Sequence, residues 1–172
     1  KKKKKIRNLE LRQQEMVRHG QENMLIADKL QRWTRNLFLV SRRQELPAKI
    51  VEEVQTQFVV PQAAIKVWGV AEAYANEPFA TGASEDVQTF TSSLTAPFCG
   101  ANISFEAATW LPDADSAKSL ALIPLRAGAA PEAFGLLVLA SPDPERFNDR
   151  MGTDFLERIG ELASAALSRL RP

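Results

Sequence analysis

The chain has 172 residues, of which 45% are hydrophobic and 25% are charged, and its formal net charge is +1 at pH 7. These values are typical of a folded domain of ordinary size with an appendage, and they argue against general disorder. The single cysteine, Cys99, excludes an internal disulfide and a cysteine-rich metal site. No apolar run approaches the roughly 20 residues that span a bilayer, and nothing resembles a secretory signal, so we expect a cytoplasmic protein with no membrane contact.

The small net charge hides an uneven distribution along the chain. Residues 1–45 hold 13 Lys and Arg against 5 Asp and Glu, whereas the remainder holds 9 against 16. A basic arm on an acidic domain is compatible with nucleic acid, with an acidic partner or with a solvated helix. Charge runs most often lie on exposed faces, so we interpret the arm as a solvated helix and keep nucleic-acid binding as an alternative.

Residues 1–44 are expected to form a helical coiled-coil arm in front of a domain at residues 45–172. From Met16 to Val40 one series of residues recurs at alternating steps of three and four, which is a heptad pattern. Asn23 at an a position fixes register and favours a parallel two-stranded homodimer. The alternative is a monomeric amphipathic helix that packs on its own domain. The predicted dimer seam consists of Asn23, Ile26, Leu30, Trp33, Leu37 and Val40.

The first half of the domain contains three recognisable elements. Apolar residues at helical spacing predict a helix over 47–58, with Pro47 near its first position. Partial alternation predicts a strand over 63–70. Residues 71–84 have no strong period and are expected to be a loop. Ser84 is a good N-cap for a helix over 85–95.

The second half is dominated by two apolar runs, 120–125 and 134–140, that predict an antiparallel hairpin. Neither run alternates, so both faces are expected to be covered and the strands to lie centrally in the sheet. Pro124 is in tension with this because it cannot donate a ladder hydrogen bond, which implies a bulge or a nitrogen that points away from a neighbour. Residues 96–118 are expected to be a long irregular connector of the kind that often carries function. A closing helix is predicted over 149–170, with Asp149 as its N-cap.

The segments SLALIPLRAG and FGLLVLASPDPERFNDRMGTDFLERIGELASAAL resemble a GAF domain. The shared features are a strand that ends in Pro-Leu-Arg, a Gly-Leu-Leu strand, a Phe before the final helix and the Leu/Ala repeats of that helix. Together with the arm, the chain from about Asn23 onward resembles the domain of unknown function 484 family. The resemblance implies an α+β fold with a GAF-like antiparallel sheet, flanked by helices and preceded by a long N-terminal helix.

The known activities of GAF domains do not carry over residue by residue. Cyclic-nucleotide binding relies on an Asn-Lys-Phe-Asp-Glu set, of which only Phe147 and Asp149 are present. Bilin attachment uses a cysteine that is often followed by histidine, whereas Cys99 is followed by glycine. Nothing marks an axial haem ligand, and the GAF-type methionine sulfoxide reductases use more than one cysteine. The cofactor therefore stays unknown.

No constellation of residues predicts catalysis or metal binding. Cys99 has no basic neighbour in sequence to lower its pKa, so we interpret it as a small buried apolar residue. Asp113 and Asp115 lack the spacing of a calcium loop and are interpreted as a solvated loop. His19 is the only histidine and has no second ligand nearby. We therefore expect a protein that is not an enzyme.

A ligand pocket is the remaining functional candidate. Ligand sites are apolar clefts with a few placed polar groups, and the middle of the domain is rich in aromatic residues, with Arg126 available for an anion contact. The alternative is that the aromatic residues fill the core and Arg126 is a surface charge. The candidate ligand-binding residues are Trp68, Phe90, Phe98, Cys99, Phe105, Trp110, Ile123 and Arg126.

These observations favour a non-enzymatic GAF-like sensor or interaction module that dimerises through its N-terminal helix. A small molecule is expected to bind between the sheet and residues 97–115 and to alter the coiled coil by population shift. The alternatives are a ligand-free dimeric scaffold for protein partners and a nucleic-acid-associated protein that uses the basic arm.

Overall fold

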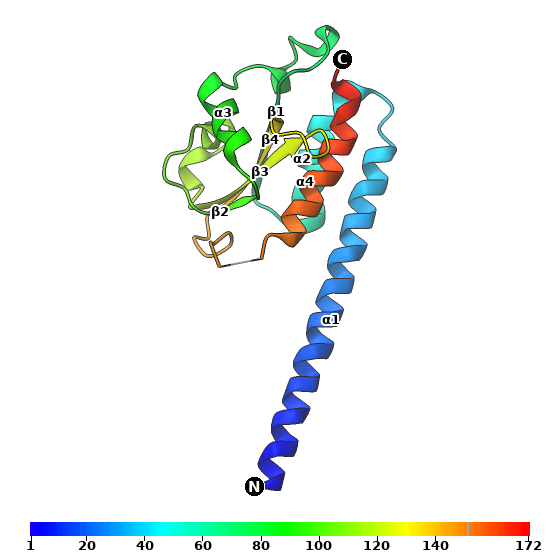
Figure 1. Cartoon of the computed structure of the whole chain (residues 1–172), viewed down its shortest axis with the longest axis vertical. Coiled ribbons are helices and arrows are strands. Elements are labelled where there is room, and N and C mark those ends of the chain that lie inside the picture. Colours follow the sequence, from blue (N-terminus) through cyan, green and yellow to red (C-terminus); the bar gives the residue numbers. More distant parts are fainter. Residues whose placement is uncertain (151) are drawn as a thin grey trace.

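A four-stranded antiparallel sheet forms the centre of the molecule in the computed structural model, which describes residues 1–150 and 152–172 (Figure 1). The strands are β1 (Gln62–Val67), β2 (Phe98–Ala101), β3 (Ser119–Arg126) and β4 (Ala133–Ser141), in the order β1-β4-β3-β2. The predicted hairpin, β3 and β4, therefore occupies the two central positions, as expected from its continuous apolar runs.

Helices cover both faces of this sheet (Figure 1). The helices α1 (Lys2–Phe38), α2 (Leu46–Phe58) and α4 (Asp154–Leu167) pack on one face, and α3 (Glu85–Ser93) packs on the other. The side chains of β3 alternate between the two layers: Ile123 faces the three-helix side and Leu122 faces the α3 side, and both are 1% exposed or less. The prediction of a sheet buried on both faces, in an α+β fold with a long N-terminal helix, is confirmed.

The local signals for α2 and α3 are also confirmed. Pro47 lies in the first turn of α2, where its missing N–H leaves no helical hydrogen bond unmade. The Ser84 hydroxyl accepts a hydrogen bond from the backbone nitrogen of Val87 at 3.1 Å and so caps α3. The strand predicted over 63–70 is shorter, because Gly69 adopts a positive φ of 67° and turns the chain away.

Pro124 lies where β3 has a neighbour on one side only. The edge strand β2 pairs with Ser119–Leu122 and ends before Pro124, while β4 continues to pair opposite it. The irregularity in register falls one step later, between Leu125 and Arg126. A strand tolerates proline at such a one-sided position, so the structure resolves the tension seen in the sequence.

Two further predicted elements differ from the structure. The connector over 96–118 is not wholly irregular, because it contains β2 and two short 3-10 helices, Glu106–Trp110 and Ala114–Ser116. The closing helix begins at Asp154 rather than Asp149. The side chain of Asn148 accepts a hydrogen bond from the backbone nitrogen of Arg150 at 3.0 Å, which forms a local turn in place of helix. Met151, part of the predicted helix, lies outside the described residues.

The helix α1 has two parts with different surroundings. Its first part, over residues 2–28, extends beyond the domain and is exposed (Figure 1). Its last turns pack on α2 and α4, and Leu30, Trp33 and Leu37 are buried there. Three residues of the predicted dimer seam are thus covered by their own chain, because the apolar stripe that contains them also fits the domain. No helix among the described residues is both long and apolar enough to cross a membrane.

Candidate functional site

The aromatic residues proposed as a pocket gather on the α3 side of the sheet and contact one another. The Phe105 ring lies 5.8 Å from the ring of Phe90 and 5.3 Å from that of Phe98, measured between centroids. Trp68 and Trp110 pack against the same buried cluster. These rings shelter the sheet from solvent by stacking and edge contacts, which is the core-filling interpretation of their role.

The other candidates do not join this aromatic group. Cys99 and Ile123 belong to the cluster on the opposite, three-helix face of the sheet. Burial raises the pKa of the Cys99 thiol to about 11, so the reactive thiolate is a minor form at neutral pH. The residues described in the structure include no cluster of three or more His, Cys, Asp or Glu side chains arranged to hold a metal ion.

Arg126 connects the two helices that flank the end of β3. Its guanidinium donates a hydrogen bond to the carbonyl oxygen of Ser92 at 2.8 Å and a longer one to that of Thr91 at 3.5 Å. These carbonyls lie in the last turn of α3, where a positive charge is favourable. The backbone nitrogen of Arg126 donates to the hydroxyl of Ser164 on α4 at 3.1 Å. Arg126 therefore connects β3 to both α3 and α4, a structural role that neither the predicted anion contact nor the alternative of a surface charge included.

A cleft of about 330 Å³ opens beside Arg126, between the end of β3, the linker from α3 to β2, and one side of α4. Its wall combines polar and apolar groups, with two carboxylates on α4. The residues that line it are Thr95, Ala96, Pro97, Ile123, Pro124, Arg126, Gly128, Glu157, Gly160, Glu161 and Ser164. We refer to it as the α4 cleft. Only Ile123 and Arg126 of the predicted pocket residues belong to it.

Gly160 sets the depth of the α4 cleft. A Cβ atom at this position would lie 2.9 Å from Cγ2 of Ile123, closer than real contacts allow. The missing side chain lets α4 approach β3 closely at this point of the cleft. A glycine inside a helical pattern can mark such a close approach, but the sequence-based prediction of this helix did not single out Gly160.

The helix α4 separates this cleft from α1. On its other flank a second cleft, of about 320 Å³, is lined by Ala27, Leu30, Gln31, Thr34, Arg158, Glu161 and Leu162. A smaller and more apolar one, of about 140 Å³, is lined by Thr34, Leu37, Phe38, Leu46, Leu162, Ala165, Ala166 and Arg169. Glu161 borders both the α4 cleft and the 320 Å³ cleft on the other flank, so one side chain connects the two surfaces.

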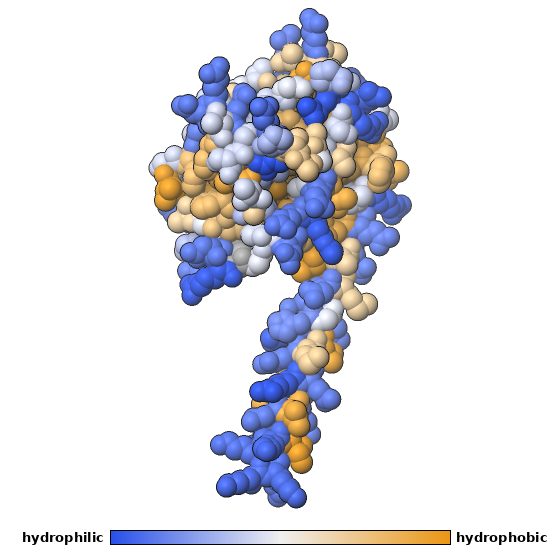
Figure 2. All heavy atoms as spheres, viewed as in Figure 1, coloured by the Kyte–Doolittle hydropathy of each residue, from blue (hydrophilic) through white to orange (hydrophobic). Residues whose placement is uncertain are grey.

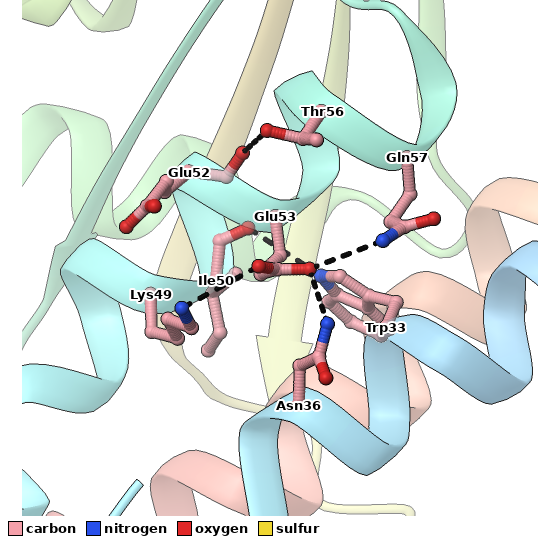
Figure 3. Close-up of polar contacts among 8 residues, drawn as sticks. All are labelled: Trp33, Asn36, Lys49, Ile50, Glu52, Glu53, Thr56 and Gln57. Carbon is pink, nitrogen blue, oxygen red and sulfur yellow. Dashed lines mark hydrogen bonds and ion pairs between the residues drawn. The ribbon is translucent and has the colours of Figure 1, made fainter. Parts of the chain in front are cut away.

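A buried polar cluster holds the end of α1 on α2 (Figure 3). The Glu53 carboxylate, only 8% exposed, accepts a hydrogen bond from the Asn36 amide at 2.8 Å and a longer one from Gln57 at 3.4 Å. The ammonium of Lys49 lies 3.4 Å from its other oxygen. Nearby, the indole nitrogen of Trp33 donates to the carbonyl oxygen of Ile50 at 3.4 Å. These contacts fix the direction in which α1 leaves the domain.

The pKa of Glu53 is lowered from its ordinary value of 4.5. Burial by itself raises this pKa, but the hydrogen bonds from Asn36, Gln57 and Lys49 and the charge of Lys49 outweigh it. The carboxylate therefore stabilises the fold at pH values above its unfolded pKa. This stabilisation is lost as the pH falls through the lowered, folded pKa.

We expect Glu53→Gln to lower the free energy of unfolding at pH 7 by about 1–2 kcal/mol, because charge-assisted hydrogen bonds are lost. The gap between the parent and the variant is expected to narrow below pH 4.5, where the carboxylate of the parent becomes protonated. Urea unfolding across this pH range measures it. Glu52→Gln, an exposed position on the same helix, is the control. A gap that does not change with pH would show that Glu53 is not ionised in the folded protein.

Solved structures that share this arrangement of sheet and helices include several GAF domains, and the fold of this chain is a GAF-like fold. A GAF domain from an Acinetobacter phosphoenolpyruvate-protein phosphotransferase matches with a TM-score of 0.59 and 16% identity, over 83% of this chain and 92% of that one. The GAF domain of a protein described as a sensor histidine kinase, from Pseudomonas syringae pv. tomato, matches with a TM-score of 0.56 and 15% identity, over 89% of this chain and 92% of that one. The free methionine-R-sulfoxide reductase of Neisseria meningitidis matches with a TM-score of 0.55 and 11% identity, over 83% of this chain and 88% of that one.

At these identities the likeness shows the fold alone. The family is shown by sequence: the model of the family described as "Protein of unknown function, DUF484" matches residues 1–171, and the chain belongs to this family. A comparison with curated proteins finds no match. The resemblance drawn from the hairpin and the closing helix is thus confirmed, and the match also includes the residues before Asn23.

Proposed function

We propose that this chain is a non-enzymatic sensory module that works as a homodimer and binds a small polar molecule in the α4 cleft. The observation that carries the proposal is the position of α4, which has the cleft on one flank and α1 on the other. The GAF domain of a protein described as a sensor histidine kinase, which has the same fold, supports a sensory role. We favour the α4 cleft over the space between the sheet and residues 97–115, because the aromatic rings there contact one another.

The proposed ligand acts through α4. Glu157, Glu161 and Ser164 on this helix line the cleft, so a molecule bound there touches α4 directly. A ligand can shift the position of α4 only if it binds one position more tightly than another. Because Leu162 on the opposite flank lies against α1, a shift of α4 is passed to the arm.

A pair of tryptophan variants tests the cleft. Ala96 is exposed and lines the α4 cleft, so Ala96→Trp is expected to fill it without disturbing the core. Ala48→Trp adds the same side chain at an exposed position on α2 and serves as the control. The three proteins are screened by thermal shift and native mass spectrometry against amino acids, nucleotides and tetrapyrroles.

We expect at least one compound to raise the unfolding temperature of the parent and of Ala48→Trp, and to have no effect on Ala96→Trp. A shift that survives in Ala96→Trp places the ligand elsewhere and contradicts the proposed site. If the protein is a dimer but no compound raises its unfolding temperature, the sensory role is contradicted and the ligand-free scaffold is favoured.

A further inference from the structure

A second uncharged stripe runs along α1, separate from the one that is buried on the domain. It recurs at alternating steps of four and three residues, which is heptad spacing. Val17, Met24 and Phe38 on it are 60%, 70% and 81% exposed. Its members are Gln13, Val17, Gly20, Met24, Ala27, Gln31, Thr34 and Phe38, and we refer to them as the free stripe.

The free stripe carries no charged residue, as is also true of the exposed start of the other stripe at Met16, Asn23 and Ile26. Unlike that stripe, it stays uncovered beside the domain, where Phe38 is exposed. The charged residues of α1 between 13 and 38 all lie off it: Glu15, Arg18, Glu22, Asp28, Lys29, Arg32 and Arg35. Figure 2 shows hydrophobic residues along the arm among the hydrophilic ones that otherwise cover it. An exposed helix that keeps one stripe free of charge over more than three heptads has the surface of a helix with a partner.

The sizes of these residues suit a second helix at close range. Large side chains at Val17, Met24 and Phe38 alternate with small ones at Gly20, Ala27 and Thr34. Nothing lies within 4 Å of a Cβ built on Gly20. Glycine in an exposed helix costs about 1 kcal/mol relative to alanine, so its presence here is explained by the close approach that it permits.

The free stripe leads directly onto α4. Thr34 and Phe38 border the apolar 140 Å³ cleft whose other side is formed by Leu162, Ala165 and Ala166 of α4. An occupant of the stripe therefore meets α4 as well as α1 at the domain end. The part of the occupant that meets this end must be apolar, because the 140 Å³ cleft is itself mostly apolar.

We propose that the free stripe is the interface for a second copy of this chain, with the two α1 helices parallel. In a parallel pair the Phe38 side chain of the second copy comes to the apolar cleft beside α4. An antiparallel pair that covers the same length would bring the polar Gln13 and the charged Glu10 there instead. The proposal rests on the homodimer proposed above and adds which surface and which orientation it uses.

Cysteine variants of the full-length chain test this surface. Met24→Cys lies on the free stripe, and Leu25→Cys, at an exposed neighbouring position about 100° round the helix, is the matched control. The only native cysteine, Cys99, is buried, so the parent gives the background. Masses are measured in reducing buffer by light scattering, and cross-links by non-reducing gel after mild oxidation.

We expect dimers of all three proteins, with disulfide-linked dimer formed by Met24→Cys and not by the parent or Leu25→Cys. A dimer in which Leu25→Cys links as readily as Met24→Cys overturns the proposed surface while leaving the homodimer intact. Linking only in a mixture of Met24→Cys with Ala27→Cys shows an antiparallel pair and overturns the orientation. A monomer at high micromolar concentration contradicts the homodimer itself.

A charge on the stripe gives an independent measurement. Met24→Arg is expected to raise the dissociation constant of the dimer by about 30-fold or more, the effect of a central interface residue. Leu25→Arg is expected to leave it unchanged. Both positions are exposed in the single chain, so circular dichroism is expected to show the same helix content in both variants. Equal weakening by the two variants contradicts the proposed surface.

Discussion

Replacing Trp33 with alanine is expected to lower the free energy of unfolding by about 3–5 kcal/mol. Trp33 is fully buried where α1 meets α2, and its indole nitrogen donates to the carbonyl oxygen of Ile50. The truncation leaves a cavity in the middle of the three-helix layer and removes the hydrogen bond to the Ile50 carbonyl, which lies inside α2. Urea unfolding followed by circular dichroism measures the loss.

Two further variants show which part of the effect is packing. Trp33→Phe keeps most of the buried surface and loses the hydrogen bond, so we expect a smaller cost of about 1–2 kcal/mol. Leu25→Ala removes an exposed side chain from the same helix and is expected to change stability by less than about 0.5 kcal/mol. A Trp33→Ala cost as small as that of Leu25→Ala would show that the end of α1 is not part of the core.

Removing residues 1–44 is expected to prevent stable folding, whereas removing residues 1–28 leaves the fold intact. The longer deletion takes away Leu30, Trp33 and Leu37, and it exposes Leu46 and Ile50 on α2. Each large side chain that loses its burial costs about 1.5–3 kcal/mol, and the total approaches the whole stability of an ordinary domain, about 5–15 kcal/mol. Thermal unfolding of both truncated proteins is the measurement.

The same comparison tests the boundary between arm and domain. The sequence favours residues 1–44 and 45–172, because Leu46-Pro47 interrupts the helical pattern. We propose instead that the folding unit begins near Lys29, where α1 first becomes partly buried. A chain of residues 45–172 that unfolds cooperatively at the temperature of the parent would favour the boundary after residue 44.

The hairpin was predictable because its chemistry is unambiguous. Continuous apolar runs bounded by turn residues are buried on both faces, and only central strands meet that condition. The edge strand β2 was missed because its four residues include Gly100 and follow Pro97, so they carry no strand pattern. The true start of α4 was missed because a local turn at Asn148 competes with the helix signal of Asp149.

The candidate site was harder to predict than the fold. Heptad spacing shows that one face of a helix packs against a partner. The spacing does not differ between a partner that is another chain and one that is the domain that follows. The stripe that contains Trp33 packs on the domain of its own chain, and the sequence could not show which of the two partners it would have. The residues of the α4 cleft come from three separate segments, and only Gly160 carried a local hint of their meeting.

The length of α1 has a mechanical consequence. The part over residues 2–28 is exposed, and at 1.5 Å per residue it is roughly 40 Å long. A tilt of about 10° where Asn36 and Glu53 hold its base would swing the far tip, roughly 50 Å away at this helical rise, through about 9 Å. A small change of angle at the base of α1 thus becomes a movement of several ångströms at its N-terminal end, which is large enough to change contacts with a neighbouring molecule.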